Sequence, residues 1–331
     1  QVNHGLAGSP LPPVSVILPI LNEEPYLADS VRSILTQDYQ GTIEIVLAVG
    51  PSRDRTHEIA DQLHREDSRV IVVSNPTGRT AAGLNIALRA SSGSVIVRVD
   101  GHAQIPQNYI SIAVALLAET GAVNVGGMMA AKGVTTFERA VAAAMRSPLG
   151  VGASRFHTGG EAGAVDTVYL GVFQRQALIA IGGFDERFTR AQDWELNYRL
   201  RSNGGTIFFD PRLEVSYRPR PTLAALAKQY FEYGRWRRVV SRRHQGTINY
   251  RYLAPPLALS GYVFSLIFGA LIDPILFIPA LIYSLFVPVA SLAIAGSITQ
   301  FIYLLAVIPT MHFAWGAGFI TSPKNLVPAE R

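Results

Sequence analysis

The sequence predicts an α/β domain with a mostly parallel sheet, then a basic amphipathic helix, then a C-terminal region of transmembrane helices. Apolar runs typical of buried strands alternate four times with helical segments over roughly the first 120 residues. Between residues 218 and 251 there are nine Lys or Arg residues and a single acidic one, Glu232. Residues 252–323 contain only one charged side chain, that of Asp273. These three observations define the predicted order of the parts.

Four short apolar runs predict buried strands at residues 14–19, 43–49, 69–74 and 94–100. Helical periodicity between and after them predicts helices at residues 22–36, 54–64, 79–90 and 106–119. In parallel sheets of this kind, ligands bind beyond the carboxyl ends of the strands. We therefore expect the chemistry at the strand ends, in segments 19–22, 50–54 and 100–102.

The second half of the α/β part is less regular. It predicts strands at residues 167–173 and 206–210, helices at 174–181 and 194–203, and a turn at 182–186. A long helix follows at residues 221–244, with its basic side chains concentrated near the C-terminal end, where they complement the helix dipole. The predicted domains are the α/β domain at 1–220, the basic interface helix at 221–251, the membrane region at 252–323 and a tail at 324–331.

The apolar region splits into three candidate helices at residues 254–272, 274–295 and 298–320. Each is close to the roughly 20 residues that cross a bilayer. The connections are so short that one helix is a candidate for a re-entrant or interfacial segment. A buried helical bundle in a soluble protein is the alternative interpretation. The first thirteen residues show no signal-peptide pattern.

The basic segment lies next to the apolar region, and this position favours an anionic membrane surface over nucleic acid as its partner. Arginines before the first apolar helix place the α/β domain on the cytoplasmic side of the cell membrane, in a multi-pass protein. A set of solvated basic loops is the alternative. We expect membrane lipids as partners and no nucleic acid.

Several classes of chemistry are excluded by what the sequence lacks. The chain has no cysteine, which excludes disulfides, thiolate metal sites and cysteine nucleophiles. It contains no GxxxxGK[ST] phosphate loop and no GxGxxG after the first predicted strand, which argues against P-loop hydrolases and Rossmann dehydrogenases.

Carboxylates at two places are candidates for chemistry. Asp100 follows a predicted strand, where a carboxylate suits a divalent metal that bridges a diphosphate. His102 is a second candidate ligand or a diphosphate contact. Asp193 or Glu195 is a candidate general base for an acceptor hydroxyl. The alternative for Asp100 and Asp193 is a helix-capping role.

Two further residues have both a functional and a structural interpretation. Trp236, beside Arg235 on the predicted basic helix, is suited to stack on a sugar or base, or to anchor the helix at a membrane interface. His157 lies in a glycine-rich segment at 150–163 without metal-ligand spacing, and a mobile surface loop is the favoured interpretation.

Taken together, residues 13–252 resemble the family 2 glycosyltransferases and their GT-A nucleotide-sugar-binding fold. Val14-Ser-Val-Ile-Leu-Pro-Ile-Leu-Asn-Glu23 resembles the first strand and the Pro-x-x-Asn-Glu nucleotide loop of the family. Asn75-Pro-Thr-Gly-Arg-Thr-Ala-Ala-Gly-Leu-Asn85 is similar to the segment that borders the nucleotide. Asp100-Gly-His102 stands at the Asp-x-Asp metal motif and Gln192-Asp193 at the Glu-Asp catalytic-base motif.

Within the family, the likeness is greatest to the succinoglycan-biosynthesis glucosyltransferase type with its C-terminal membrane helices. It is based on Arg98-Val-Asp-Gly-His-Ala103, on Val165-Asp-Thr-Val-Tyr-Leu-Gly171 and on Gln229-Tyr-Phe-Glu-Tyr-Gly-Arg-Trp236. The resemblance implies an inverting enzyme that moves one sugar, glucose, from a UDP-linked donor to a hydroxyl of a lipid-linked saccharide in exopolysaccharide synthesis. A polyprenyl-phosphate glycosyltransferase and a non-catalytic membrane scaffold are the alternatives.

The resemblance also assigns roles to residues. It implies Asp193 as the base, and Asp100 with His102 as the ligands of Mg²⁺ or Mn²⁺. The implied nucleotide contacts are Pro19, Asn22, Glu23, Asp54, Arg79, Asn85 and Asp100. The implied pocket for the acceptor or the donor sugar comprises Gly183, Gln192, Trp194, Gln229, Arg235 and Trp236.

Two positions depart from the family pattern. His102 replaces the second Asp of Asp-x-Asp, and Gln192 replaces the Glu before Asp193. The spacing of Gln229, Arg235 and Trp236 differs from the Gln-x-x-Arg-Trp motif of processive synthases. Three short spans also leave little room for a polysaccharide channel, which favours single sugar additions.

Overall fold

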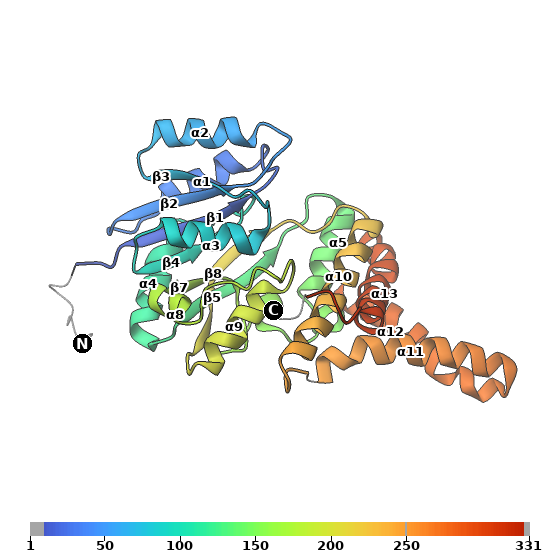
Figure 1. Cartoon of the computed structure of the whole chain (residues 1–331). Helices are drawn as coiled ribbons and strands as arrows, with labels where there is room; N and C mark the ends of the chain where they lie inside the picture. The colour runs from blue at the N-terminus through green and yellow to red at the C-terminus, as the bar shows by residue number, and fades with distance from the viewer. Residues whose placement is uncertain (1–9, 249, 328–331) are drawn as a thin grey trace, which may run out of the picture. The chain divides into compact units, whose positions relative to one another are not determined.

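The structure is a computed structural model that describes residues 10–248 and 250–327 (Figure 1). The first nine residues of the predicted α/β domain and residues 328–331 of the predicted tail lie outside the described residues. The chain divides into two compact units. One holds Gln1–Met128 and Glu161–Val215, and the other holds Met129–Gly160 and Ser216–Arg331.

The first unit is built on an eight-stranded sheet in the order β3-β2-β1-β4-β7-β5-β8-β6. The strands are β1 (Val14–Ile20), β2 (Ile43–Val49), β3 (Val70–Ser74), β4 (Val95–Arg98), β5 (Asn124–Ala131), β6 (Gly163–Ala164), β7 (Tyr169–Gln174) and β8 (Ile207–Tyr217). The first four strands are parallel to one another, whereas β7 is antiparallel to both β4 and β5, and β6 to β8. The predicted α/β class is confirmed.

Helices cover both faces of this sheet, which explains the almost continuous apolar runs of its strands. Val16 and Leu18 of β1 belong to one core cluster, whereas Ile17 between them belongs to the other. The first cluster includes side chains of α1 (Leu27–Leu35), α2 (Thr56–Glu66) and α4 (Tyr109–Thr120). The second includes side chains of α3 (Thr80–Ala90), α8 (Arg175–Ala180) and α9 (Gln192–Ser202).

Some elements differ from the sequence prediction. The helix predicted from residue 22 begins at Leu27, because Asn22 takes a positive φ of 55° and Pro25 disfavours helical backbone before it. The strand predicted at 206–210 extends to Tyr217 as β8. The glycine-rich segment contains two short helices, α6 (Pro148–Val151) and α7 (Arg155–Thr158). Strand β5 was not predicted.

The second unit is mostly helical. Besides α6 and α7 it contains α5 (Thr136–Met145), α10 (Leu223–Arg243), α11 (Tyr250–Leu271), a 3-10 turn η1 (Pro274–Phe277), α12 (Ile278–Ile294) and α13 (Ile298–Thr321). Three segments, Tyr250–Leu271, Pro274–Ile294 and Ile298–Thr321, are long and apolar enough to cross a membrane, as predicted.

Helices α10 and α13 pack closely because glycines stand at their contact. A Cβ atom placed at Gly234 of α10 would collide with the carbonyl oxygen of Trp315, and one at Gly318 of α13 with that of Phe231. Small residues of this kind let two helix backbones approach. The opposite end of α13 packs on α5, where the rings of Phe137 and Tyr303 meet edge to face at 5.6 Å.

Candidate active site

Arg98, the last residue of β4, joins the two carboxylates that sequence analysis selected. Its side chain is only 5% exposed, and its Nε and Nη2 atoms lie 3.3 and 3.1 Å from Oδ1 of Asp100. Its Nη1 atom pairs with Oδ1 of Asp193, in the first turn of α9. The side chains of Asp100 and Asp193 are 22% and 31% exposed, so both remain open to a ligand. The fold therefore brings these two positions into one site.

The structure distinguishes the two carboxylates considered as the base. Glu195 is 1% exposed and binds Arg199 through two hydrogen bonds of 2.7 Å. Arg199 in turn donates to the carbonyl oxygens of Ile181 and Gly183, so this pair fixes α9 to the preceding turn. The N-cap of α9 is Ala191 rather than Asp193, and among residues 10–248 and 250–327 no side chain caps the helix. Asp193 is left as the accessible carboxylate.

Glu23 and His102 meet beside Asp100. Nδ1 of His102 lies 2.9 Å from Oε1 of Glu23, and the histidine side chain is 50% exposed. Gly101 lies between Asp100 and His102, and a Cβ atom there would come within 2.8 Å of Glu23 Cγ. The glycine lets the loop after β1 approach the loop after β4, which is where ligands bind to sheets of this class.

The loops after β1 and β2 are locked together. The backbone N–H of Asn22 donates to Ser52 Oγ at 3.0 Å, and Asn22 Oδ1 accepts from the N–H of Arg53 at 2.8 Å. Asp54 accepts from Thr56 Oγ1 at 2.5 Å and from the N–H of Glu24 at 3.1 Å. The hydrogen bond from Thr56 is the main reason why the pKa of Asp54 is lowered. Asp54 therefore shapes the predicted nucleotide loop.

Asn85 and Gly183 are partners despite their separation in the sequence. Asn85 Nδ2 donates to the carbonyl oxygen of Phe184 at 2.8 Å, and Asn85 Oδ1 accepts from the N–H of Phe184 at 2.8 Å. Gly183 has a φ of 73°, and a Cβ atom there would lie 2.6 Å from Asn85 Oδ1. The asparagine thus holds the glycine turn that precedes α9.

The remaining predicted residues of the first unit lie around these loops. Pro19 is half-buried in β1, and a Cβ atom at Gly83 of α3 would lie 3.2 Å from its Cβ. Arg79 is exposed and forms the N-cap of α3. Gln192 is the first residue of α9, and Trp194 stacks on Tyr198 with a ring separation of 6.0 Å.

Three predicted pocket residues belong to the second unit, on α10. Gln229 donates to the hydroxyl groups of Tyr217 and Tyr233 at 2.7 and 2.8 Å. Arg235 and Trp236 both contact Glu232, at 3.2 Å each, and Trp236 is 4% exposed. In this structure these side chains therefore organise the helix and its packing.

The donor atoms beside β4 fit a divalent cation that is shared with a diphosphate. Within residues 10–248 and 250–327, no group of three or more His, Asp or Glu side chains is placed to hold a metal alone. Asp100 and His102 offer a carboxylate and an imidazole from one tight turn. Mg²⁺ in nucleotide sites commonly takes one or two protein ligands and completes its shell with phosphates and water. The residues therefore fit an ion that arrives with a nucleotide.

Arg98 is the site residue that sequence reasoning did not select. The available signal was a charged side chain at the end of an otherwise apolar, buried strand, since charged residues are almost never fully buried unless they are paired. Its partners could not be inferred, because Asp193 is distant in the sequence.

A mostly parallel α/β sheet with carboxylates gathered at its strand ends is the arrangement of the GT-A fold. The family model "Glycosyl transferase family 2" matches residues 15–182, and the chain belongs to this family. It is 31% identical over 317 residues to the succinoglycan biosynthesis protein ExoA of Rhizobium meliloti (strain 1021), covering 92% of this chain and 93% of the relative.

Two solved structures share the fold. The mannosyltransferase PcManGT from Pyrobaculum calidifontis, in complex with GDP-Man and Mn²⁺, superposes with a TM-score of 0.59 at 20% identity and covers 93% of this chain and 86% of its own. TarS 1-349 from S. aureus, in complex with UDP, gives a TM-score of 0.53 at 18% identity and covers 92% and 90%.

Proposed function

We propose that this family 2 glycosyltransferase is an inverting enzyme that moves one glucose unit from a UDP-linked donor to a hydroxyl of a lipid-linked saccharide. The product would serve the synthesis of a cell-surface or exopolysaccharide. The observation that carries the proposal is the pairing of both Asp100 and Asp193 with Arg98. It brings together a carboxylate for the diphosphate end of the donor and a carboxylate for the acceptor hydroxyl.

The relatives support this proposal. The relative of highest identity reported above takes part in succinoglycan biosynthesis. Of the two proteins with the same fold, one was solved with UDP and the other with GDP-Man and Mn²⁺. The apolar helices and the basic segment before them support attachment to the cell membrane, with the α/β domain in the cytoplasm.

The proposed reaction is a single displacement. Asp193 accepts the proton of the acceptor hydroxyl while the hydroxyl oxygen forms a bond to C1 of the sugar. The bond between C1 and the diphosphate oxygen breaks, and its electron pair leaves with the nucleotide diphosphate. Because attack comes from the face opposite the leaving group, the configuration at C1 inverts. Arg98 holds the Asp193 carboxylate in place through Oδ1.

On the donor side, Asp100 and His102 would hold a Mg²⁺ or Mn²⁺ ion, which when bound neutralises charge on the departing diphosphate. Glu23 fixes the His102 ring through Nδ1. The loop that contains Asn22, and that Asp54 braces, forms the proposed nucleotide-binding wall.

The test is the variant Asp193→Asn. Loss of the base is expected to lower the rate of sugar transfer by about 10²- to 10⁴-fold, the range of a general base. Binding of UDP, measured by calorimetry, is expected to stay within twofold of the wild type. Asp166→Asn is the matched control, because Asp166 is an exposed carboxylate of the same unit that contacts Arg201 at 3.5 Å.

Two outcomes would contradict the proposal. Full transfer to a lipid phosphate by Asp193→Asn would favour the polyprenyl-phosphate enzyme, since an anionic acceptor requires no base. Failure of the wild type to bind any nucleotide or nucleotide sugar would favour the non-catalytic scaffold.

A further inference from the structure

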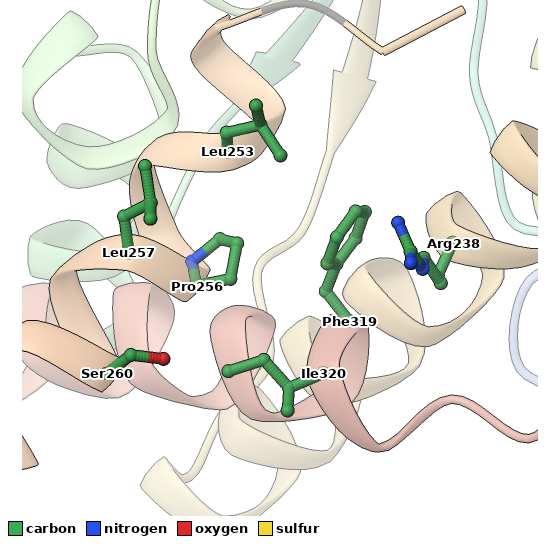
Figure 2. A pocket seen from close by; sticks show the side chains of 7 residues that line it. All are labelled: Arg238, Leu253, Pro256, Leu257, Ser260, Phe319 and Ile320. Carbon is green, nitrogen blue, oxygen red and sulfur yellow. The ribbon is translucent and has the colours of Figure 1, made fainter.

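A groove of about 300 Å³ lies between three helices of the second unit. Figure 2 shows its walls, which combine one cation, one hydroxyl and five apolar side chains. They are Arg238 from α10, Leu253, Pro256, Leu257 and Ser260 from α11, and Phe319 and Ile320 from α13. The volume is at the lower end of the range for small-molecule sites, so the groove suits one narrow chain.

The polar end of the groove carries unneutralised positive charge. The guanidinium carbon of Arg238 lies 4.9 Å from the ring centre of Phe319, and among the described residues no carboxylate forms an ion pair with Arg238. Arg242 lies near enough that the charge of Arg238 adds to burial in lowering its pKa. Arg238 lines the groove and Arg242 adds positive charge near it, so the groove favours an anionic ligand.

The ends of three helices meet at this groove. Arg242, near the end of α10, donates to the carbonyl oxygens of Ser322 and Pro323 at 3.0 and 2.9 Å. At Gly316, a Cβ atom would lie 2.7 Å from the carbonyl oxygen of Pro255. The start of α11 and the end of α13 are therefore level with the arginines of α10. Since such side chains reside at the headgroup level, the groove begins there and continues along apolar helices.

We propose that this groove binds the carrier of the lipid-linked acceptor, a single-chain lipid phosphate or diphosphate. Arg238 binds the phosphate, with Arg242 contributing charge, and the apolar walls hold the first part of the chain. Charge complementarity selects the lipid phosphate over a neutral lipid, and the small volume favours one chain over the two of a phospholipid. This inference rests on the proposed function, of which it specifies the acceptor.

The experiment uses the full chain in phosphatidylcholine nanodiscs with labelled geranylgeranyl diphosphate as the probe. The variant Arg238→Gln is expected to weaken binding about tenfold, the effect of losing a charge-assisted hydrogen bond. Lys228→Gln is the matched control, because it removes one charge from an exposed position of the same helix. It is expected to change binding less than twofold.

A second pair of variants tests the apolar walls. Ser260→Trp is expected to fill the groove and weaken binding at least fivefold. Leu266→Trp places the same ring on an exposed position of α11 that does not line the groove, and is expected to have no effect. Equal effects of Arg238→Gln and Lys228→Gln would overturn the proposal. Equal binding of geranylgeraniol, or complete competition by phosphatidylglycerol, would also overturn it.

UDP binding by the same preparations separates this inference from the proposed function. A wild type that binds UDP but not geranylgeranyl diphosphate contradicts the groove and leaves the glycosyltransferase proposal standing. A wild type that binds the lipid diphosphate but no nucleotide or nucleotide sugar contradicts the proposed function. It leaves the proposal that the groove binds a lipid phosphate standing.

Discussion

At the residue scale, Arg98 connects two carboxylates that the sequence places far apart. Its planar guanidinium group presents several N–H donors in a fixed geometry, so one side chain contacts Asp100 and Asp193 together. Because the side chain of Arg98 is buried and paired with both carboxylates, it is held in one orientation. We therefore regard Arg98 as a positioning residue for the proposed base.

The variant Arg98→Gln is expected to lower kcat about 10²-fold, because a small misplacement of a catalytic group has an effect of that size. The KM for the donor is expected to change much less, and Arg98→Lys is expected to recover part of the kcat. Steady-state kinetics with both variants check this prediction. Arg32→Gln is the control, since Arg32 forms an exposed pair with Asp29. A rise in the KM for the donor with kcat unchanged would contradict a positioning role.

His157 gives a pH dependence to the stability of the second unit. Burial and the nearby charge of Arg251 lower the pKa of His157 to about 4 from its ordinary 6.5. The unfolded chain therefore takes up this proton first, and the free energy of unfolding is expected to fall as the pH decreases from 6.5 to 4. Thermal unfolding at several pH values measures this decrease in stability. His157→Gln should flatten the dependence, whereas the exposed His57→Gln should preserve it.

The sequence selects individual site residues but not their partners. Asp100 and Asp193 were identifiable from motifs, whereas the role of Asn85 in holding the turn at Phe184 depends on a hydrogen bond across 99 positions. Asp54 likewise uses its carboxylate on the N–H of Glu24. These are tertiary contacts, which a single sequence without a structure does not contain.

At the element scale, the parallel strands were predictable because their apolar runs are continuous and bounded by turn residues. Strand β5, with the sequence NVGGMMAA, lacks that signal, since glycine and alanine are rare in strands. It is a strand because it pairs with β7. Helix α5 was not predicted either, although the capping box of Thr135 and Glu138 is a local sequence signal for its start.

The glycine contact between α10 and α13 gives a prediction on stability. Gly318→Ala is expected to destabilise the protein by about 1–3 kcal/mol, because the added methyl group meets the backbone of Phe231. Gly261→Ala is the control, since no atom of the part of the chain that the structure describes lies within 4 Å of a Cβ atom at that helical position. Thermal melting in nanodiscs checks both. Equal melting temperatures of the two variants would contradict the close approach of these helices.

At the scale of the whole membrane region, the arrangement of helices limits the membrane topology. Helices α11 and α12 form a hairpin in which Ser265 Oγ accepts from the N–H of Ala280 at 3.0 Å. Three successive crossings would place the start of α11 and the end of α13 on opposite sides of a core about 30 Å thick. Instead, Pro255 and Gly316 are in contact. The number of complete crossings is therefore expected to be even.

The absence of cysteine makes this topology testable with single-cysteine variants. Lys228→Cys on α10 and Lys324→Cys after α13 are both exposed positions. A membrane-impermeant maleimide is expected to label both from the same side of sealed vesicles. Labelling of the two from opposite sides would show that the number of complete crossings is odd and would contradict this prediction.

The hairpin also has a mechanical consequence. The rings of Tyr262 and Tyr283 pack on Phe313 of α13, at 5.3 and 4.7 Å, and the far end of the hairpin of α11 and α12 projects beyond α13 (Figure 1). With the start of α11 at the headgroup level, the 22 residues of that helix reach about 33 Å, which is close to the depth of the whole hydrocarbon core. A hairpin of that depth has to match the thickness of the bilayer in which it lies. The melting temperature of this protein should therefore fall in nanodiscs whose lipids have much shorter or much longer acyl chains.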